Sequence, residues 1–373
     1  MPSLRQPDVR LQTALSLFVV WVAVSGFAER GAVYAQEAES FWDNSLSEIS
    51  TLIPGKLAIP QFDSKTLGGR LFWGDVRFFR GYRIQHNVLT GHYRLLDPFD
   101  VRRKAGSREE CDRALEEIIL EKQLEPMTGT AVVVIHGIAR SSKSMTKMCR
   151  ELEKAGYVVV NFDYPSTRLP LAQSTSYLSQ TLASLEGVEK VHFACWSMGG
   201  LLVRSYLRDY AEQRDPRVGR MVMMGTPNQG AELATLLQKN FAFRFVFGPA
   251  GQELIAHPDG PVKSLPVPDF EFGIIAGARG NERGWNPFIP GDDDGTVSVE
   301  STRLEGASDF LVVKALHSFI CLQPETIEAV KNFFETGAFR EDGERDPVLK
   351  LTSDVDQSET VDPLGENSQD RSA

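Results

Sequence analysis

The sequence predicts an α/β protein with a mostly parallel sheet, helices on both faces of that sheet, and antiparallel strands before it. Two observations predict this class. From residue 131 onward, short and wholly apolar runs alternate with longer amphipathic stretches. Such runs are typical of parallel strands that are buried on both faces. Between residues 71 and 97, apolar and polar residues instead alternate around turn residues, which is typical of antiparallel strands.

Composition excludes several function classes before any motif is considered. The 373 residues are 42% hydrophobic and 24% charged, as in an ordinary globular protein, which excludes collagen-like, coiled-coil, disordered and polytopic membrane proteins. Of the net charge of −10, residues 341–373 carry −7, from ten acidic and three basic residues, so the remainder carries −3. Nucleic-acid binding needs clustered basic residues, and we therefore expect no nucleic-acid partner.

The amino terminus has the pattern of an export signal. Arg5 and Arg10 precede an uncharged stretch at 11–28. Small residues at Val33 and Ala35 offer a cleavage site before Gln36, and Gly26 with Ala28 offers an earlier one. We therefore predict that residues 1–35 are a signal peptide and that the protein is exported, to the periplasm or beyond the cell. The alternative is an uncleaved helix that anchors the chain in a membrane.

The four cysteines are too few and too scattered for a disulfide scaffold, even in an oxidising compartment. At most one structural disulfide is expected. Cys111 and Cys149 both fall on predicted helices and could form it, but the sequence does not decide this.

The elements before the parallel sheet are predicted at residues 36–130, either as part of the main domain or appended to it. After the antiparallel strands, Ser107 and Glu110 form a capping-box pattern, and the apolar residues that follow have helical spacing.

The main domain is predicted at 131–337, with an insertion at 226–270 and an acidic, disordered tail at 338–373. Its parallel strands are predicted at 131–135, 157–162, 191–195, 221–224, 272–275 and 310–313. Helices are expected at 142–155 and 174–186, ending at Gly156 and Gly187.

A serine at a strand-to-helix turn is the first sign of chemistry. Ser197 directly follows an apolar strand and directly precedes a helical pattern that begins at Met198. Small residues two positions before and after such a serine let the backbone turn sharply. Gly199 fills the second position and Cys195 the first, so the pattern is C-x-S-x-G rather than G-x-S-x-G.

Three further segments follow strands whose carboxyl ends meet at one edge of the sheet. His136-Gly137-Ile138 follows the first parallel strand, an acidic cluster at 292–294 follows the fifth, and His317 follows the last. A serine nucleophile needs a histidine base and a carboxylate that orients it. The chain order serine, acid, histidine is the order that this sheet topology uses.

Across roughly 131–336 the chain resembles the α/β-hydrolase superfamily, nearest to bacterial lipases and esterases. The resemblance lies in the segments IHGI, WSMGG, GTPNQG, DGTV and LHS. It implies that the backbone N–H groups of Ile138 and Met198 form an oxyanion hole. It also favours Asp294 as the triad acid, because Asp294 precedes Gly-x-Val, with Asp292 and Asp293 as the alternatives. A calcium-binding role for Asp292 and Asp293 is a further alternative.

The resemblance implies a serine hydrolase that cleaves carboxylic esters of small molecules or lipids, through Ser197, Asp294 and His317. This chemistry needs no metal or organic cofactor. A thioesterase, a peptidase, an acyltransferase and a non-catalytic binding protein of the same fold are the alternatives. The insertion contains FAFRFVF at 241–247, which we interpret either as a lid that contacts acyl chains or a membrane surface, or as packing against the body.

Overall fold

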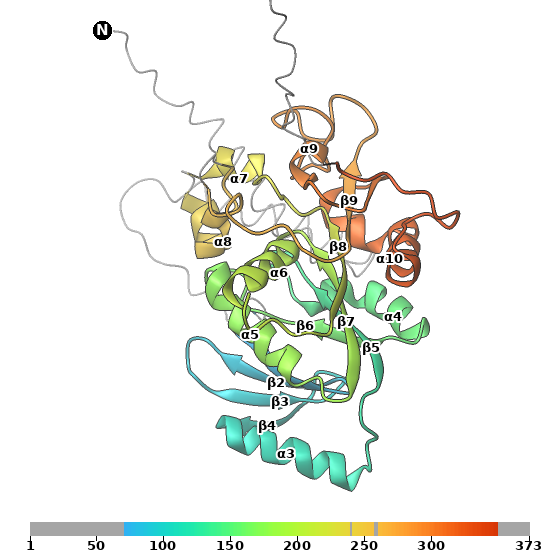
Figure 1. Ribbon diagram of the computed structural model, residues 1–373. Helices are drawn as coiled ribbons and strands as arrows, with labels where there is room; N and C mark the ends of the chain where they lie inside the picture. The colour runs from blue at the N-terminus through green and yellow to red at the C-terminus, as the bar shows by residue number, and fades with distance from the viewer. Residues whose placement is uncertain (1–70, 239–240, 257–259, 350–373) are drawn as a thin grey trace, which may run out of the picture.

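A computed structural model describes residues 71–238, 241–256 and 260–349 (Figure 1). Six parallel strands form the central sheet in the order β10-β9-β8-β7-β5-β6. Every apolar run that was predicted as a parallel strand lies in this sheet, so the predicted fold class is confirmed. The strands are β5 (Gly129–Ile135), β6 (Val158–Phe162), β7 (Val188–Trp196), β8 (Val218–Met224), β9 (Phe272–Ala278) and β10 (Asp309–Lys314).

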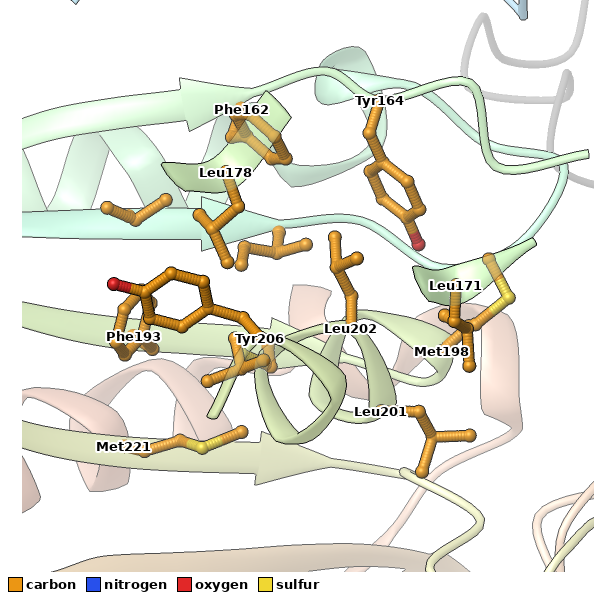
Figure 2. Packing of buried hydrophobic residues seen from close by; sticks show 14 of the residues in the cluster. Phe162, Tyr164, Leu171, Leu178, Phe193, Met198, Leu201, Leu202, Tyr206 and Met221 are labelled. Atoms are coloured by element: carbon orange, nitrogen blue, oxygen red, sulfur yellow. The ribbon is translucent and has the colours of Figure 1, made fainter. Parts of the chain in front are cut away.

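Helices cover both faces of this sheet because successive strand residues point to opposite faces. On β5, Val133 and Ile135 belong to one buried cluster and Val132 and Val134 to the other. Figure 2 shows the first cluster, in which Leu178, Leu202 and other helical residues pack over the strands. The first face is covered by α5 (Leu171–Ala183) and α6 (Met198–Asp209), and the second by α4 (Thr146–Lys154) and α10 (Pro324–Thr336).

Two glycines were expected to end helices, and the structure confirms this for Gly156 but not for Gly187. Gly156 directly follows the last residue of the α4 cap and has a φ of 90°, as expected for a helix end. Helix α5 ends earlier than predicted, at Ala183, and Gly187 lies in the turn that leads into β7. A Cβ at Gly187 would lie 2.2 Å from the carbonyl oxygen of Met127, so this turn requires glycine for space as well as for its φ.

A separate antiparallel sheet precedes the central sheet, as predicted. The capping box at Ser107 and Glu110 is confirmed at the start of the helix that follows this sheet. The fourth strand was not predicted, because its sequence RRKAG has no apolar alternation. The elements are β1 (Trp73–Phe79), β2 (Tyr82–Asn87), β3 (Tyr93–Leu96), β4 (Arg102–Gly106) and α3 (Arg108–Glu121).

This antiparallel sheet lies between α3 and α5 and shares one core with the central domain (Figure 1). Val76 on β1 and Leu115 on α3 belong to the same buried cluster as Leu178 on α5. The described part of the amino-terminal region is therefore built into the hydrophobic body.

The insertion after β8 contains the helices α7 (Glu232–Leu237) and α8 (Phe241–Glu253). Helix α8 is broken at Gly248, which has a φ of 59° and is followed by Pro249. The side chain of Phe247 is buried, whereas the side chains at 241–246 lie outside the described part of the structure. The remaining short helices are η2 (Ser142–Met145), α9 (Val299–Thr302) and η3 (His317–Leu322).

The predicted boundary of the acidic tail was wrong, because residues 338–349 pack back onto the body. The carboxylate of Asp309, at the start of β10, is fully buried and accepts backbone hydrogen bonds from Phe339 at 2.7 Å and Asp346 at 2.9 Å. Phe339 also packs against Phe333 of α10. The predicted disordered tail beyond residue 349 lies outside the described residues.

All four cysteines are free and buried, so the possible disulfide between Cys111 and Cys149 is absent. Cys111 lies in the cluster that includes α3, and Cys149 lies in the cluster on the opposite face of the central sheet. Within the described residues, no helix has the length and apolarity to cross a bilayer. The predicted signal peptide or anchor at 1–35 lies outside those residues.

Candidate active site

Ser197 lies on a strained turn between β7 and α6. Its φ of 54° and ψ of −124° are unusual for a residue with a side chain, and such strain persists only where the surroundings enforce it. The backbone N–H of Ser197 donates to the Met224 carbonyl at 2.8 Å, and the Thr226 hydroxyl donates to the Ser197 carbonyl at 2.9 Å. These bonds from β8 and the loop after it fix the turn.

The glycines after Ser197 are required by close packing of α6 on its neighbours. A Cβ at Gly199 would lie 2.7 Å from the carbonyl oxygen of Ile135, and a Cβ at Gly200 would lie 2.4 Å from the Thr226 hydroxyl. Cys195 departs from the usual glycine without a conflict, because its side chain is fully buried in the core cluster beneath α6.

Three side chains from separate loops form a continuous chain of hydrogen bonds. The Ser197 Oγ lies 2.9 Å from the Nε2 of His317, and the Nδ1 of His317 lies 2.6 Å from the Oδ2 of Asp294. The other oxygen of Asp294 accepts backbone N–H bonds from Thr296 at 2.9 Å and Val297 at 2.8 Å. The predicted serine, acid and histidine are thus brought together in the geometry of a catalytic triad.

The neighbouring acids hold the loop and do not contact His317 in the described structure. The carboxylate of Asp292 accepts the backbone N–H groups of Arg279 and Gly280, each at 2.9 Å. Asp293 accepts the N–H groups of Asn286 at 3.0 Å and Gly295 at 2.6 Å. Burial raises the pKa of Asp293 above its usual value. Among the described residues, no group of three or more His, Cys, Asp and Glu is arranged to hold a metal ion.

The indole of Trp196 has a role that the sequence did not predict. Its Nε1 donates to the carbonyl oxygen of His317 at 3.1 Å, while its ring lies 5.8 Å from the imidazole between centroids. Strand β7, which leads into Ser197, therefore also holds the loop that carries His317.

The loop after β5 lies directly beside Ser197. A Cβ at Gly137 would lie 3.0 Å from the Cβ of Ser197, so glycine allows this close approach. Ile138 lines the same pocket as Ser197, and Met198 is the first residue of α6, where a backbone N–H has no partner within its helix. Both predicted oxyanion-hole residues thus lie next to Ser197, and their role as donors stays a prediction.

A pocket beside Ser197 and His317 has a mainly apolar lining. Ser197 and His317 lie among its lining residues, together with Arg140 and Trp196. The insertion contributes the largest share of the apolar lining, through Ala231, Leu233, Ala234, Leu237, Phe247 and Leu254. Such a lining suits an apolar substrate group placed beside a reactive hydroxyl.

The central parallel sheet, the serine turn after β7 and the triad order together define the α/β-hydrolase fold. Residues 131–257 match the family model of palmitoyl protein thioesterase, so this segment is similar to that family. No curated protein shows significant similarity to the chain.

Solved structures that resemble the chain include hydrolases with low sequence identity. A mature lipase of Bacillus licheniformis is 20% identical, with 57% of this chain and 94% of that chain covered and a TM-score of 0.43. A bromoperoxidase of Bacillus anthracis is 18% identical, with coverages of 56% and 93% and a TM-score of 0.39. A metagenomic carboxyl esterase is 16% identical, with coverages of 52% and 66% and a TM-score of 0.39.

Proposed function

We propose that this serine hydrolase of the α/β-hydrolase type cleaves carboxylic esters that carry an apolar acyl or alcohol group. The observation that carries the proposal is the unbroken contact from Asp294 through His317 to Ser197, with His317 and Ser197 lining an apolar pocket. An activated hydroxyl in such a pocket is suited to acyl transfer.

In the proposed first step, the Ser197 Oγ attacks the ester carbonyl carbon while His317 accepts the hydroxyl proton. Asp294 keeps the Nδ1 of His317 protonated and stabilises the imidazolium. The oxyanion lies against the backbone N–H groups of Ile138 and Met198. When the carbon–oxygen bond to the alcohol breaks, His317 returns its proton to the departing alcohol and an acyl-serine remains. Water then attacks that ester with His317 again as the base, and the acid and free Ser197 are released.

A thioester of a fatty acyl chain is the second candidate substrate. The match of residues 131–257 to the palmitoyl protein thioesterase family favours it, and the same triad can release a thiol in place of an alcohol.

The first experiment compares oxygen esters and thioesters of identical acyl chains, from acetyl to palmitoyl, with Ser197→Ala assayed in parallel. Removal of the nucleophile should lower turnover by a factor on the order of 10⁴ or more. A fluorophosphonate probe should label the wild type and spare Ser197→Ala. Turnover that survives in Ser197→Ala would refute the assignment, and an inert, unlabelled wild type would favour a non-catalytic binding protein. A preference for thioesters at equal chain length would select the second candidate.

Export of the protein and contact of the insertion with a membrane surface are proposals as well. They are supported by the uncharged stretch at 11–28 and by the phenylalanines at 241–247. Amino-terminal sequencing of the mature protein from fractionated cells tests export. Cleavage near Ala35 supports it, whereas an intact amino terminus in the membrane fraction supports an anchor. Sedimentation with phospholipid vesicles tests membrane contact.

A further inference from the structure

A buried cluster of charges connects the amino-terminal sheet with the loop beside the nucleophile. Asp163 follows β6, and its carboxylate accepts a hydrogen bond from the Nη1 of Arg83 on β2 at 2.8 Å. The backbones of Asp163 and Asp75 on β1 are also joined, because the N–H of Asp75 donates to the Asp163 carbonyl at 2.9 Å. Asp163 is 5% exposed and Arg83 is 7% exposed, so this ion pair is buried at the junction of the two sheets.

The Asp163 carboxylate contacts both ends of the loop at 136–142. At the far end of the loop, Ser142 donates its backbone N–H at 2.7 Å and its hydroxyl at 2.8 Å to this carboxylate. At the near end, the Nε2 of His136 lies 3.6 Å from the Oδ1 of Asp163. Between these ends lie Gly137, against Ser197, and Ile138, in the pocket.

The near end of the loop is held by Tyr164, the residue after Asp163. Its hydroxyl donates to the His136 carbonyl at 3.0 Å, and its ring stacks on the imidazole with centroids 4.6 Å apart. The Nδ1 of His136 faces the Gly137 carbonyl oxygen at 2.8 Å, so this nitrogen is the donor. The conformation of residues 136–138 is thus set by the segment that Arg83 holds in place.

We propose that Arg83 and Asp163 are positioning residues that hold the oxyanion loop at 136–142, so that the amino-terminal sheet takes part in catalysis through this ion pair. The proposal rests on the proposed hydrolase function. A buried carboxylate that loses the guanidinium paired with it is strongly destabilised, and Asp163 would then be expected to protonate or shift. Either change alters the acceptors that fix Ser142 and displaces the loop, and a displacement of about 1 Å can cost on the order of 10²-fold in rate.

The test compares Arg83→Met with Arg77→Met and with Arg83→Lys. Arg77 is a matched control, because it lies in the same sheet and pairs with Asp112 and Glu116 on α3, away from the loop. All rates are measured on an ester that the wild type cleaves, and they are divided by the number of active sites that a fluorophosphonate titrates.

For Arg83→Met we expect kcat to fall about 10- to 100-fold with KM within about threefold, because oxyanion stabilisation acts on the transition state. Affinity for a trifluoromethyl ketone, which forms a tetrahedral adduct with the serine, should fall in parallel. Arg83→Lys should recover part of kcat, and Arg77→Met should keep the wild-type kcat. An unchanged kcat in Arg83→Met, or an equal loss in Arg77→Met, overturns the proposal.

If Arg83→Met does not fold, Ser142→Ala tests the proposal in its place. This variant removes only the hydrogen bond from the Ser142 hydroxyl to the Asp163 carboxylate. A kcat loss of about three- to tenfold with little change in KM supports the proposal, and an unchanged kcat overturns it. A wild type that is inert and unlabelled overturns the proposed function and this inference together. An active wild type with an unaffected Arg83→Met or Ser142→Ala overturns this inference alone.

Discussion

Replacement of Asp294 by asparagine tests the triad at the point where the sequence left three acids open. The Oδ1 side of this carboxylate accepts the N–H groups of Thr296 and Val297, so the amide oxygen of an asparagine is forced to that side. Its NH₂ group then faces the Nδ1 of His317 in place of an oxygen 2.6 Å away. His317 must therefore present an unprotonated Nδ1 and carry its proton on Nε2, towards Ser197.

In that tautomer His317 donates to the serine hydroxyl and cannot accept its proton. The same exchange in a serine protease triad lowers kcat by about 10⁴, which corresponds to about 5 kcal/mol of transition-state stabilisation. We expect a loss of this size in Asp294→Asn with a small change in KM, because the exchange conserves size and leaves the pocket unchanged.

The assay is steady-state hydrolysis of an ester that the wild type cleaves, with Asp292→Asn as the matched control. An asparagine at 292 can still accept a hydrogen bond from the N–H of Arg279 or Gly280, so its rate should stay within about threefold of the wild type. If Asp294→Asn keeps wild-type activity, or if Asp292→Asn is the variant that loses it, the assignment of Asp294 is wrong.

Three further predictions concern packing, pH and the pocket. Gly200→Ala should lower the free energy of unfolding by about 1 to 3 kcal/mol, because its Cβ would lie 2.4 Å from the Thr226 hydroxyl. Thermal denaturation measures this loss of stability, and the double variant with Thr226→Ala should recover part of it. Burial raises the pKa of Asp75 to about 7, from 3.8 in the absence of the fold, so its ionisation opposes folding increasingly between about pH 4 and pH 7. The difference in Tm between Asp75→Asn and the wild type should therefore shift in favour of Asp75→Asn as the pH rises from about 4 to about 7. A Tm difference that does not change with pH would contradict the prediction. Phe247→Ala should lower kcat/KM for palmitoyl esters several-fold and leave acetyl esters unchanged, because Phe247 lines the apolar pocket, whereas equal losses would contradict this reading.

Much of the fold could be predicted because the central strands have a strong local signal. Fully buried parallel strands consist of wholly apolar runs, and each run was found with small errors at its ends. Strand β4 was missed because its residues are mainly polar or small and its pairing with β3 depends on tertiary context. The bonds between Asp309 and residues 339 and 346 were missed because hydrogen bonds to backbone N–H groups have no sequence pattern.

The candidate triad could be predicted because each member follows a recognisable strand in a fixed chain order. Residues that support the triad have no such signal. Arg83 and Asp163 are 80 positions apart, and only the packing of one sheet on the other brings them together. Trp196 directly precedes Ser197 in the sequence, but its bond to the His317 carbonyl depends on the path of a loop 121 positions later.

The folded-back segment at 338–349 sets a limit on how short a recombinant form of this enzyme can be made. A protein that stops at residue 340 would lack the Asp346 N–H that the buried Asp309 carboxylate accepts, and the pairing of Val348 with Gly306 and Ala307. The buried carboxylate at the start of β10 would keep the N–H groups of Phe310 and Phe339 but lose one of its hydrogen bonds, on the strand that leads to His317. An affinity tag or a protease site is therefore better placed after residue 349, where it leaves these contacts intact.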